Sequence, residues 1–171
     1  MTGTAPLPIL FLDVDGPLLP FGGSPQQYRC GSPEPGTNPL LARLDPALGP
    51  RLAALPGTLV WATTWEDEAN EAIAPLLGLP RLPVVYWPEP SAVEEADVRR
   101  GRSWKTRPLV AWAAGRPFAW VDDELTDADR SWVAAHHPGP ALLHRVAPAV
   151  GLTAADFRVL AGWLERHATA G

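Results

Sequence analysis

The sequence predicts an α/β fold: a five-stranded parallel sheet with helices on both of its faces. Segments 9–12 and 118–121 each consist of four apolar residues in a row, the pattern of strands that are buried on both sides. Apolar residues at helical spacing occur between the expected strands, and strands that alternate with helices form parallel sheets covered by those helices. The expected strands are 9–12, 58–62, 82–87, 118–121 and 141–146.

The first expected strand ends in two carboxylates, Asp13 and Asp15, followed by Gly16. A side-chain period of two points Asp13 and Asp15 the same way, and Gly16 permits a sharp turn with a close backbone approach. Two carboxylates this close repel each other unless a cation or a shared proton relieves them. Oxygen ligands at the carboxyl end of a strand suit a hard divalent ion such as Mg²⁺. By itself, however, Asp-x-Asp-Gly is more often a turn or a strand-end cap than a site.

Residues 17–50 differ from the rest of the chain. They contain eight prolines and five glycines, which is too many for long helices or strands. A loop of this length inside a compact domain is usually functional or disordered. Because it leaves directly from the Asp-x-Asp turn, we interpret it as a flap over the site. Its candidate substrate contacts, each equally consistent with an ordinary solvated loop, are Gln26, Gln27, Tyr28, Arg29 and Arg43.

Hydroxyl groups follow the second expected strand, at Thr63 and Thr64. Thr64 and Asp67 have the spacing of a capping box, and the helix that they would open ends at Gly78. A strand end, a hydroxyl pair and a helix N-terminus together form a natural seat for phosphate. Without a ligand, the two threonines would simply cap the helix.

A lysine and further carboxylates lie in the second half of the chain. Lys105 stands at the start of a helix that ends at Gly115, where the helix dipole disfavours a cation. This placement predicts anionic neighbours, the alternative being a solvated lysine. The fourth expected strand ends in Asp122 and Asp123.

The other connecting segments carry weaker signals. The stretch through Glu94, Glu95 and Asp97 is acidic and is expected to be a loop. Two capping boxes open the last two helices. They are Thr126 with Asp129 and Thr153 with Asp156.

Length and composition narrow the function classes. At 171 residues, the chain is most simply one domain, 1–171. A net charge of −5 and the lack of a Lys/Arg run give no support to a nucleic-acid surface. The one cysteine, Cys30, excludes an intrachain disulfide, which fits a reducing cytoplasm. Because no apolar run reaches the roughly eighteen residues of a membrane span, and no signal peptide is recognisable, we expect a cytoplasmic monomer without a membrane partner.

Four features occur in a characteristic order: Asp13-x-Asp15, Thr63, Lys105 and Asp122-Asp123. In this order and context they resemble the four sequence motifs of the haloacid dehalogenase (HAD) superfamily, and the resemblance spans residues 9–146. More narrowly, Trp-Ala-Thr-Thr-Trp and Trp-Val-Asp-Asp-Glu are similar to strings in small bacterial HAD proteins grouped with a domain of RNA-repair polypeptides. The resemblance implies a three-layer, Rossmann-like core.

The resemblance also implies a phosphatase reaction. Asp13 would be the nucleophile that forms an aspartyl-phosphate, and Asp15 the general acid/base. Thr63 would hydrogen-bond the phosphoryl oxygens, and Lys105 would offset the negative charge. Dehalogenases of the superfamily lack the second aspartate, so Asp15 points to phosphoryl transfer.

Magnesium is the cofactor that the resemblance implies. Asp13, Asp123 and the backbone carbonyl of Asp15 would hold it, and Asp122 would be an outer residue or an alternative ligand. Asp127 matches an outlying acid of some superfamily members. The expected substrate contacts are Gly16, Arg29, Thr64 and Trp65.

The expected substrate is a phosphomonoester whose identity stays open. Superfamily members often carry a folded cap domain, but here the intervals leave room for no large cap beyond the 17–50 flap. An open site would admit a nucleotide, a polynucleotide end or a protein. Three tryptophans, Trp65, Trp87 and Trp104, are expected near the sheet edge, where they would stack on a base or simply pack in the core. A HAD-like binding or regulatory module without catalysis, and a phosphotransferase, are the alternative functions.

Overall fold

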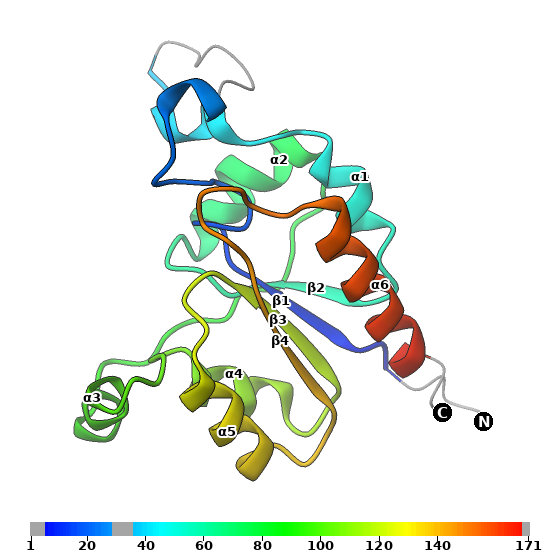
Figure 1. Cartoon of the computed structure of the whole chain (residues 1–171). Coiled ribbons are helices and arrows are strands. Elements are labelled where there is room, and N and C mark those ends of the chain that lie inside the picture. The colour runs from blue at the N-terminus through cyan, green and yellow to red at the C-terminus, as the bar shows by residue number, and fades with distance from the viewer. Residues whose placement is uncertain (1–5, 29–35, 169–171) are drawn as a thin grey trace.

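The computed structural model describes residues 6–28 and 36–168. Four strands form one parallel sheet in the order β2-β1-β3-β4 (Figure 1). They are β1 (Ile9–Leu12), β2 (Thr58–Trp61), β3 (Phe118–Asp122) and β4 (Ala141–Arg145). β1 lies in the centre and pairs in parallel with both β2 and β3. The α/β class with a parallel sheet is therefore confirmed.

The strand expected at 82–87 does not form, so the prediction of five strands is wrong. The segment lies beside β2 through a single parallel bridge between Trp61 and Val84. The Trp61 amide donates to the carbonyl of Pro83, and the Val85 amide donates to the carbonyl of Trp61, both at 2.9 Å. Pro83 has no amide hydrogen and Pro88 closes the segment, so the ladder cannot extend.

Helices cover both faces of the sheet, which makes the three expected layers (Figure 1). Leu10 and Leu12 of β1 belong to the core that is shared with one set of helices, whereas Ile9 and Phe11 belong to the core on the opposite face. The first set consists of α1 (Leu48–Ala53), α2 (Ala74–Leu77), which a π-helical turn (Ala69–Ile73) precedes, and α6 (Ala154–Ala168). The second consists of α4 (Thr106–Ala113) and α5 (Asp127–His136).

One more helix, α3 (Ala92–Arg99), replaces the loop that we expected around Glu94 and Glu95. The Ser91 side chain accepts from the Glu94 amide, and the Glu94 carboxylate accepts from the Ser91 amide, so a capping box opens it. The high charge of the segment hid this signal. α3 stands apart from the layers of the sheet (Figure 1), and Asp97 is its one buried residue.

The capping boxes at Thr126 and Thr153 are confirmed by the reciprocal hydrogen bonds with Asp129 and Asp156. The box expected at Thr64 and Asp67 is wrong. The π-helical turn after Glu68 has no side-chain cap, and the Asp67 carboxylate accepts instead from the Tyr86 hydroxyl at 3.0 Å.

The 17–50 segment holds two 3₁₀ turns, η1 (Pro25–Tyr28) and η2 (Pro39–Arg43), and runs into α1. It packs on the loop that follows β4, because the Phe21 amide donates to the Pro148 carbonyl at 2.8 Å and the Tyr28 hydroxyl to the Ala149 carbonyl at 3.1 Å. In the described part of this segment no folded cap is present. That it acts as a flap over the site stays a prediction.

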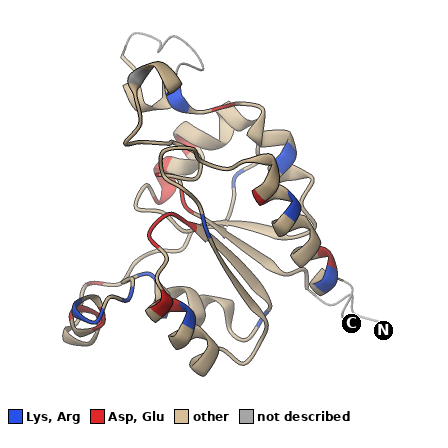
Figure 2. Ribbon diagram, viewed as in Figure 1, with Lys and Arg blue, Asp and Glu red and all other residues tan. Residues whose placement is uncertain are grey.

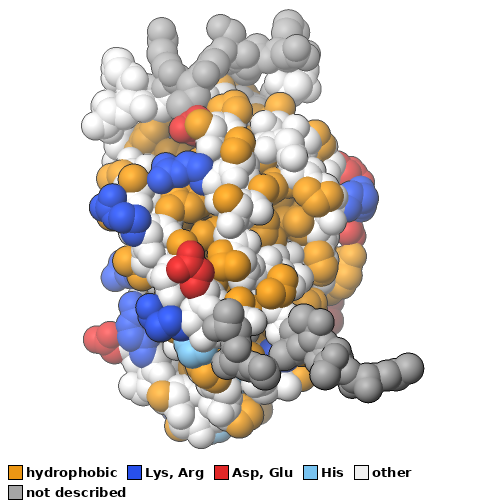
Figure 3. Space-filling view, turned by 90° about the vertical axis from the view of Figure 1, so that its right-hand side faces the viewer, with side chains coloured by type: hydrophobic (Ala, Val, Ile, Leu, Met, Phe, Trp, Pro, Cys, Tyr) orange, Lys and Arg blue, Asp and Glu red, His pale blue; other side chains and the backbone are white. Residues whose placement is uncertain are grey.

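Figure 3 views the side of the molecule on which α1 and α6 lie. Hydrophobic side chains are spread over the middle of this face, and lysine and arginine side chains lie mainly along one margin without forming one continuous basic surface. Within the part of the chain that the structure describes, none of the helices combines the length and the apolar character needed to cross a membrane.

Candidate active site

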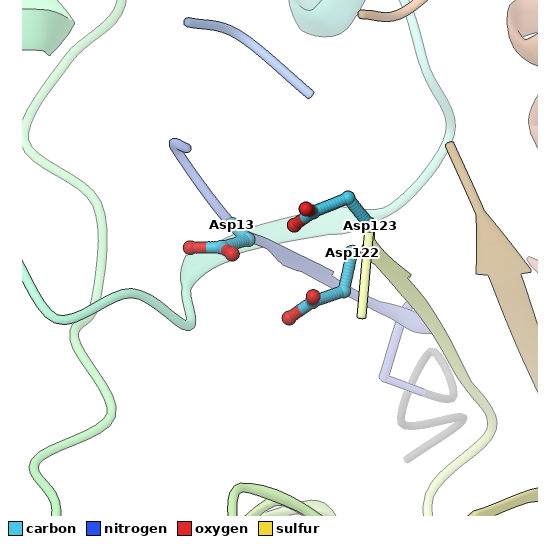
Figure 4. A group of neighbouring side chains, drawn as sticks. All are labelled: Asp13, Asp122 and Asp123. Atoms are coloured by element: carbon cyan, nitrogen blue, oxygen red, sulfur yellow. The ribbon is translucent and has the colours of Figure 1, made fainter. Parts of the chain in front are cut away.

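Three carboxylates lie together at the carboxyl ends of β1 and β3 (Figure 4). One oxygen each of Asp13, Asp122 and Asp123 lies within 4.8 Å of the other two, and all three residues are buried. They meet because Leu12 of β1 pairs with Val121 of β3, so the chain leaves both strands at the same level. Figure 2 shows the acidic residues at this end of β3.

Lys105 lies against this cluster from the start of α4. Its Nζ is 3.0 Å from Asp13 Oδ2 and 2.8 Å from Asp122 Oδ2. The side chain is buried, so the prediction of anionic neighbours is confirmed and the solvated lysine is excluded. The amine thus forms ion pairs with two carboxylates at the ends of two different strands.

Asp122 and Asp123 have different surroundings. Asp122 Oδ2 also accepts from Trp120 Nε1 at 3.3 Å, and its Oδ1 accepts from the Glu124 amide at 2.9 Å. Among the described residues, the one donor to the Asp123 carboxylate is the backbone amide of Asp123 itself. The Asp123 carbonyl accepts a hydrogen bond from Arg145 Nε at 2.9 Å. The Asp123 carboxylate oxygens are therefore available to a ligand, whereas both oxygens of Asp122 already accept hydrogen bonds from protein donors.

Burial and mutual repulsion raise the proton affinity of this cluster. Burial, with a further contribution from Asp122, raises the pKa of Asp13 to about 7 in spite of Lys105. Burial and the Asp122 charge also raise the pKa of Asp123, to about 6. Burial acts to lower the pKa of Lys105, but the charges of Asp13 and Asp122 outweigh it and the pKa is raised. The lysine is thus held as a cation.

Asp15 stands outside the group of three carboxylates. Its Oδ2 accepts a hydrogen bond from Trp65 Nε1 at 3.0 Å. Gly16, with φ +90°, packs directly on Asp123: a Cβ added at Gly16 would lie 2.8 Å from Asp123 Cβ. Only glycine fits both the left-handed backbone and this contact.

Thr63 is fully buried, and its Oγ1 accepts from the Trp65 amide at 3.3 Å. The Thr63 carbonyl accepts from Trp87 Nε1 at 3.0 Å. Thr64 is exposed. Arg29 lies outside the described residues. Asp127 is fully exposed and lies 3.9 Å from Arg130, so it takes no part in the carboxylate cluster.

The structure adds contacts that the sequence did not predict, and two of the residues that make them, Trp120 and Arg145, were not singled out. Trp120, Trp87 and Arg145 each fix a residue of the site through an N–H donor. Trp120 lies on β3 and Arg145 on β4. In the sequence, neither residue differs from an ordinary strand residue, so no local pattern predicts its contact with the site. Trp65, an expected substrate contact, donates a hydrogen bond to Asp15, and its contact with a substrate stays a prediction.

Comparison with known families agrees with this geometry. A family model described as the HAD domain in Swiss Army Knife RNA repair proteins matches residues 9–157. The chain belongs to this family. The match runs from β1 into α6, so this HAD domain includes every residue of the site described above. Searches of curated proteins and of solved structures found no match.

The donor set of this HAD domain fits a magnesium ion. Three carboxylates supply oxygen atoms only, which is what a hard divalent cation requires. When all three are ionised, their negative charges exceed the single positive charge of Lys105, so the net negative charge favours a bound cation. Repulsion among the carboxylates would be relieved by that cation.

Proposed function

We propose that this HAD domain is a magnesium-dependent phosphohydrolase that works through an aspartyl-phosphate on Asp13. The observation that carries the proposal is the joining of Asp13, Asp122 and Asp123 within 4.8 Å, with Lys105 paired to the first two. A phosphomonoester dianion would be repelled by carboxylates alone. A lysine and a cation site beside the nucleophile remove this obstacle.

Asp13, Asp123 and the backbone carbonyl of Asp15 would hold Mg²⁺, with Asp122 fixed beside them by Lys105. When bound, the ion supplies positive charge that offsets the charge of the phosphoryl group and of the carboxylates. This arrangement supports direct ligation by Asp123, because the oxygens of Asp122 already accept from Lys105, Trp120 and the Glu124 amide.

The reaction then follows from the chain's own groups. An Asp13 oxygen attacks phosphorus, the bond from phosphorus to the ester oxygen breaks, and that oxygen takes a proton from Asp15. Water next attacks the phosphoryl group on Asp13. Asp15 takes the proton of this water, the bond from phosphorus to Asp13 breaks, and inorganic phosphate leaves.

Supporting groups hold these reactants in place. Trp65 Nε1, bonded to Asp15 at 3.0 Å, fixes the direction of the general acid/base. Lys105 keeps its charge next to Asp13, where the phosphoryl oxygens gather negative charge. Thr63, two residues after β2, is the proposed hydrogen-bond donor to those oxygens.

The substrate class is the finer part of the proposal. The matched family is described from RNA repair proteins, which favours a phosphorylated nucleotide or a polynucleotide end over a sugar phosphate. The net charge of −5 adds no support for an extended nucleic-acid surface. We also propose that the protein is monomeric and cytoplasmic, the compartment being in keeping with its single cysteine.

The test is phosphate release from p-nitrophenyl phosphate, with and without Mg²⁺, by the wild type, Asp13→Asn and a control. The control is Glu71→Gln, which makes the same carboxylate-to-amide change at an exposed residue. We expect Mg²⁺-dependent release by the wild type and the control, and a loss of at least about 10³-fold in Asp13→Asn. Equal rates in Asp13→Asn and the wild type would refute the aspartyl-phosphate.

Two further readouts separate the alternatives. If phosphorylated glycerol forms at the expense of free phosphate when glycerol is added, the protein is a phosphotransferase. If the wild type neither releases phosphate nor binds Mg²⁺ by calorimetry, the domain is a binding module without catalysis.

A further inference from the structure

A pocket of about 400 Å³ lies between α3 and the proline-rich segment that precedes it. Its wall is mostly apolar and includes Pro88, Pro90, Val98 and Trp104. Its volume falls in the range of about 300–1,000 Å³ that is usual for small-molecule sites. We refer to it as the α3 pocket.

The α3 pocket adjoins the candidate active site through Trp104. The Trp104 ring centre lies 5.8 Å from Lys105 Nζ, which itself contacts Asp13. Trp104 also packs edge-on against Trp87, with ring centres 4.8 Å apart, and Trp87 is bonded to the Thr63 carbonyl. Trp104 therefore lines the pocket and also contacts Lys105 and Trp87, which belong to the proposed phosphoryl site or fix one of its residues.

The helix that closes the pocket has no role in the core. None of the residues of α3 belongs to either hydrophobic cluster of the sheet. Instead, the buried Asp97 carboxylate ties α3 to the body of the protein through ion pairs with Arg102 and Arg107. Val98, which lines the pocket, is 51% exposed. The helix is thus anchored at one charged residue and presents an apolar side chain to the pocket.

The charges around the pocket exclude an anion as its occupant. The lining residues that carry charge are Glu94, Glu95 and Arg99, and Arg99 lies 4.0 Å from Glu95. Two carboxylates against one paired guanidinium offer no spare cation for a phosphate. The phosphate of a substrate would therefore go to Lys105, and the mostly apolar wall favours an uncharged group in the pocket.

We infer that the α3 pocket binds a flat, uncharged ring of the phosphomonoester, packed against Trp104, while the phosphate lies at Asp13 and Lys105. Apolar walls favour the ring, and the indole face supplies stacking. This inference rests on the proposed function. An aryl group and a nucleobase share this chemistry, and the experiment distinguishes them.

The test fills the pocket with Val98→Trp and compares it with Val93→Trp. Val93 is on the same helix and is 55% exposed, but it does not line the pocket. KM is measured for 1-naphthyl phosphate, for adenosine monophosphate and for acetyl phosphate, which has no ring. We expect Val98→Trp to raise KM for a ring substrate roughly tenfold, and to leave acetyl phosphate unchanged, while Val93→Trp matches the wild type for all three.

The outcomes separate this inference from the proposed function. A rise in KM for 1-naphthyl phosphate alone identifies an aryl ester, and a rise for adenosine monophosphate identifies a nucleotide. Equal KM values in the two variants overturn the inference. If the wild type hydrolyses none of the three compounds, binding of 1-naphthyl phosphate is followed by tryptophan fluorescence: weaker binding in Val98→Trp alone supports the pocket, and equal binding overturns it.

Discussion

Asp122 and Asp123 are identical residues next to each other in the chain, yet their carboxylates face different partners. The oxygens of Asp122 accept from Lys105, Trp120 and the Glu124 amide. Asp123 lies against Gly16 and keeps its oxygens for a ligand. At the scale of single residues, the direction of the side chain rather than its type decides which acid is available as a ligand in the proposed metal site.

A pair of substitutions tests this division. We expect Asp123→Asn to abolish measurable Mg²⁺ binding because it would remove the proposed direct ligand. Asp122→Asn should weaken binding less, by about 10–100-fold, the usual effect of losing a residue that supports a metal site. Isothermal titration calorimetry measures both. A larger loss in Asp122→Asn than in Asp123→Asn would reverse the assignment.

Gly16 gives a second prediction at this scale. Gly16→Ala places a Cβ 2.8 Å from Asp123 Cβ, on a backbone with φ +90°. Gly36 has the same φ of +90° and nothing within 4 Å of an added Cβ, so Gly36→Ala carries only the backbone strain. We expect Gly16→Ala to lower the free energy of unfolding by about 1–3 kcal/mol more than Gly36→Ala, and to weaken Mg²⁺ binding. Urea unfolding and calorimetry check it; equal losses in the two variants would contradict it.

At the scale of elements, side-chain hydrogen bonds stabilise the first turns of several helices. The α6 capping box is one example, since the Asp156 carboxylate accepts from the Thr153 amide and hydroxyl and from His144. Burial acts to raise the pKa of Asp156, but these hydrogen bonds outweigh it and the pKa lies below its usual value. Its carboxylate therefore stabilises the fold above the usual pKa of 3.8, and this contribution is lost as pH falls further.

Asp156→Asn tests the cap. We expect it to cost about 1 kcal/mol of unfolding free energy at pH 7, the usual effect of losing a cap. The difference from the wild type should narrow below pH 3.8, where the unfolded chain takes up the proton. Urea unfolding at several pH values measures it, with Glu71→Gln as the control. A difference that stays constant with pH would show that the charge is not involved.

At the scale of the whole molecule, ionisation of the carboxylate cluster lowers the stability of the metal-free fold. The pKa of Asp13 is raised to about 7 and that of Asp123 to about 6, from 3.8. Between pH 3.8, the usual pKa, and about pH 7, the folded protein binds more protons at these two acids than the unfolded chain does. The stability that these acids contribute is therefore present below pH 3.8 and lost as pH rises to about 7.

We therefore expect Tm in EDTA to fall between pH 5 and pH 8, and Mg²⁺ to raise Tm most at pH 8, because the ion binds the ionised cluster of the folded state. Asp13→Asn should flatten the metal-free dependence on pH. Differential scanning fluorimetry measures each of these changes. A Tm that rises with pH in EDTA, or the same slope in Asp13→Asn, would contradict the assignment of the shift to Asp13.

The sequence by itself determined the parallel sheet and the family. Runs of apolar residues such as 9–12 and 118–121 are typical of strands that are buried on both faces of a sheet. The polar residues after those strands then had to meet at one edge, because parallel strands end together. The capping boxes at Thr126 and Thr153 were also predictable, since a cap is made by residues three positions apart. The same spacing was misleading at Thr64 and was overlooked at Ser91.

The tertiary structure alone decided how these parts contact one another. The bond of Trp65 to Asp15 joins residues that are 50 positions apart, and the hold of Asp97 on α3 depends on Arg102 and Arg107 folding back onto it. Likewise, segment 82–87 has the composition of a strand but forms one bridge only. Local patterns determine which residues can form an element, whereas side-chain direction and ladder length depend on neighbours that only the fold supplies.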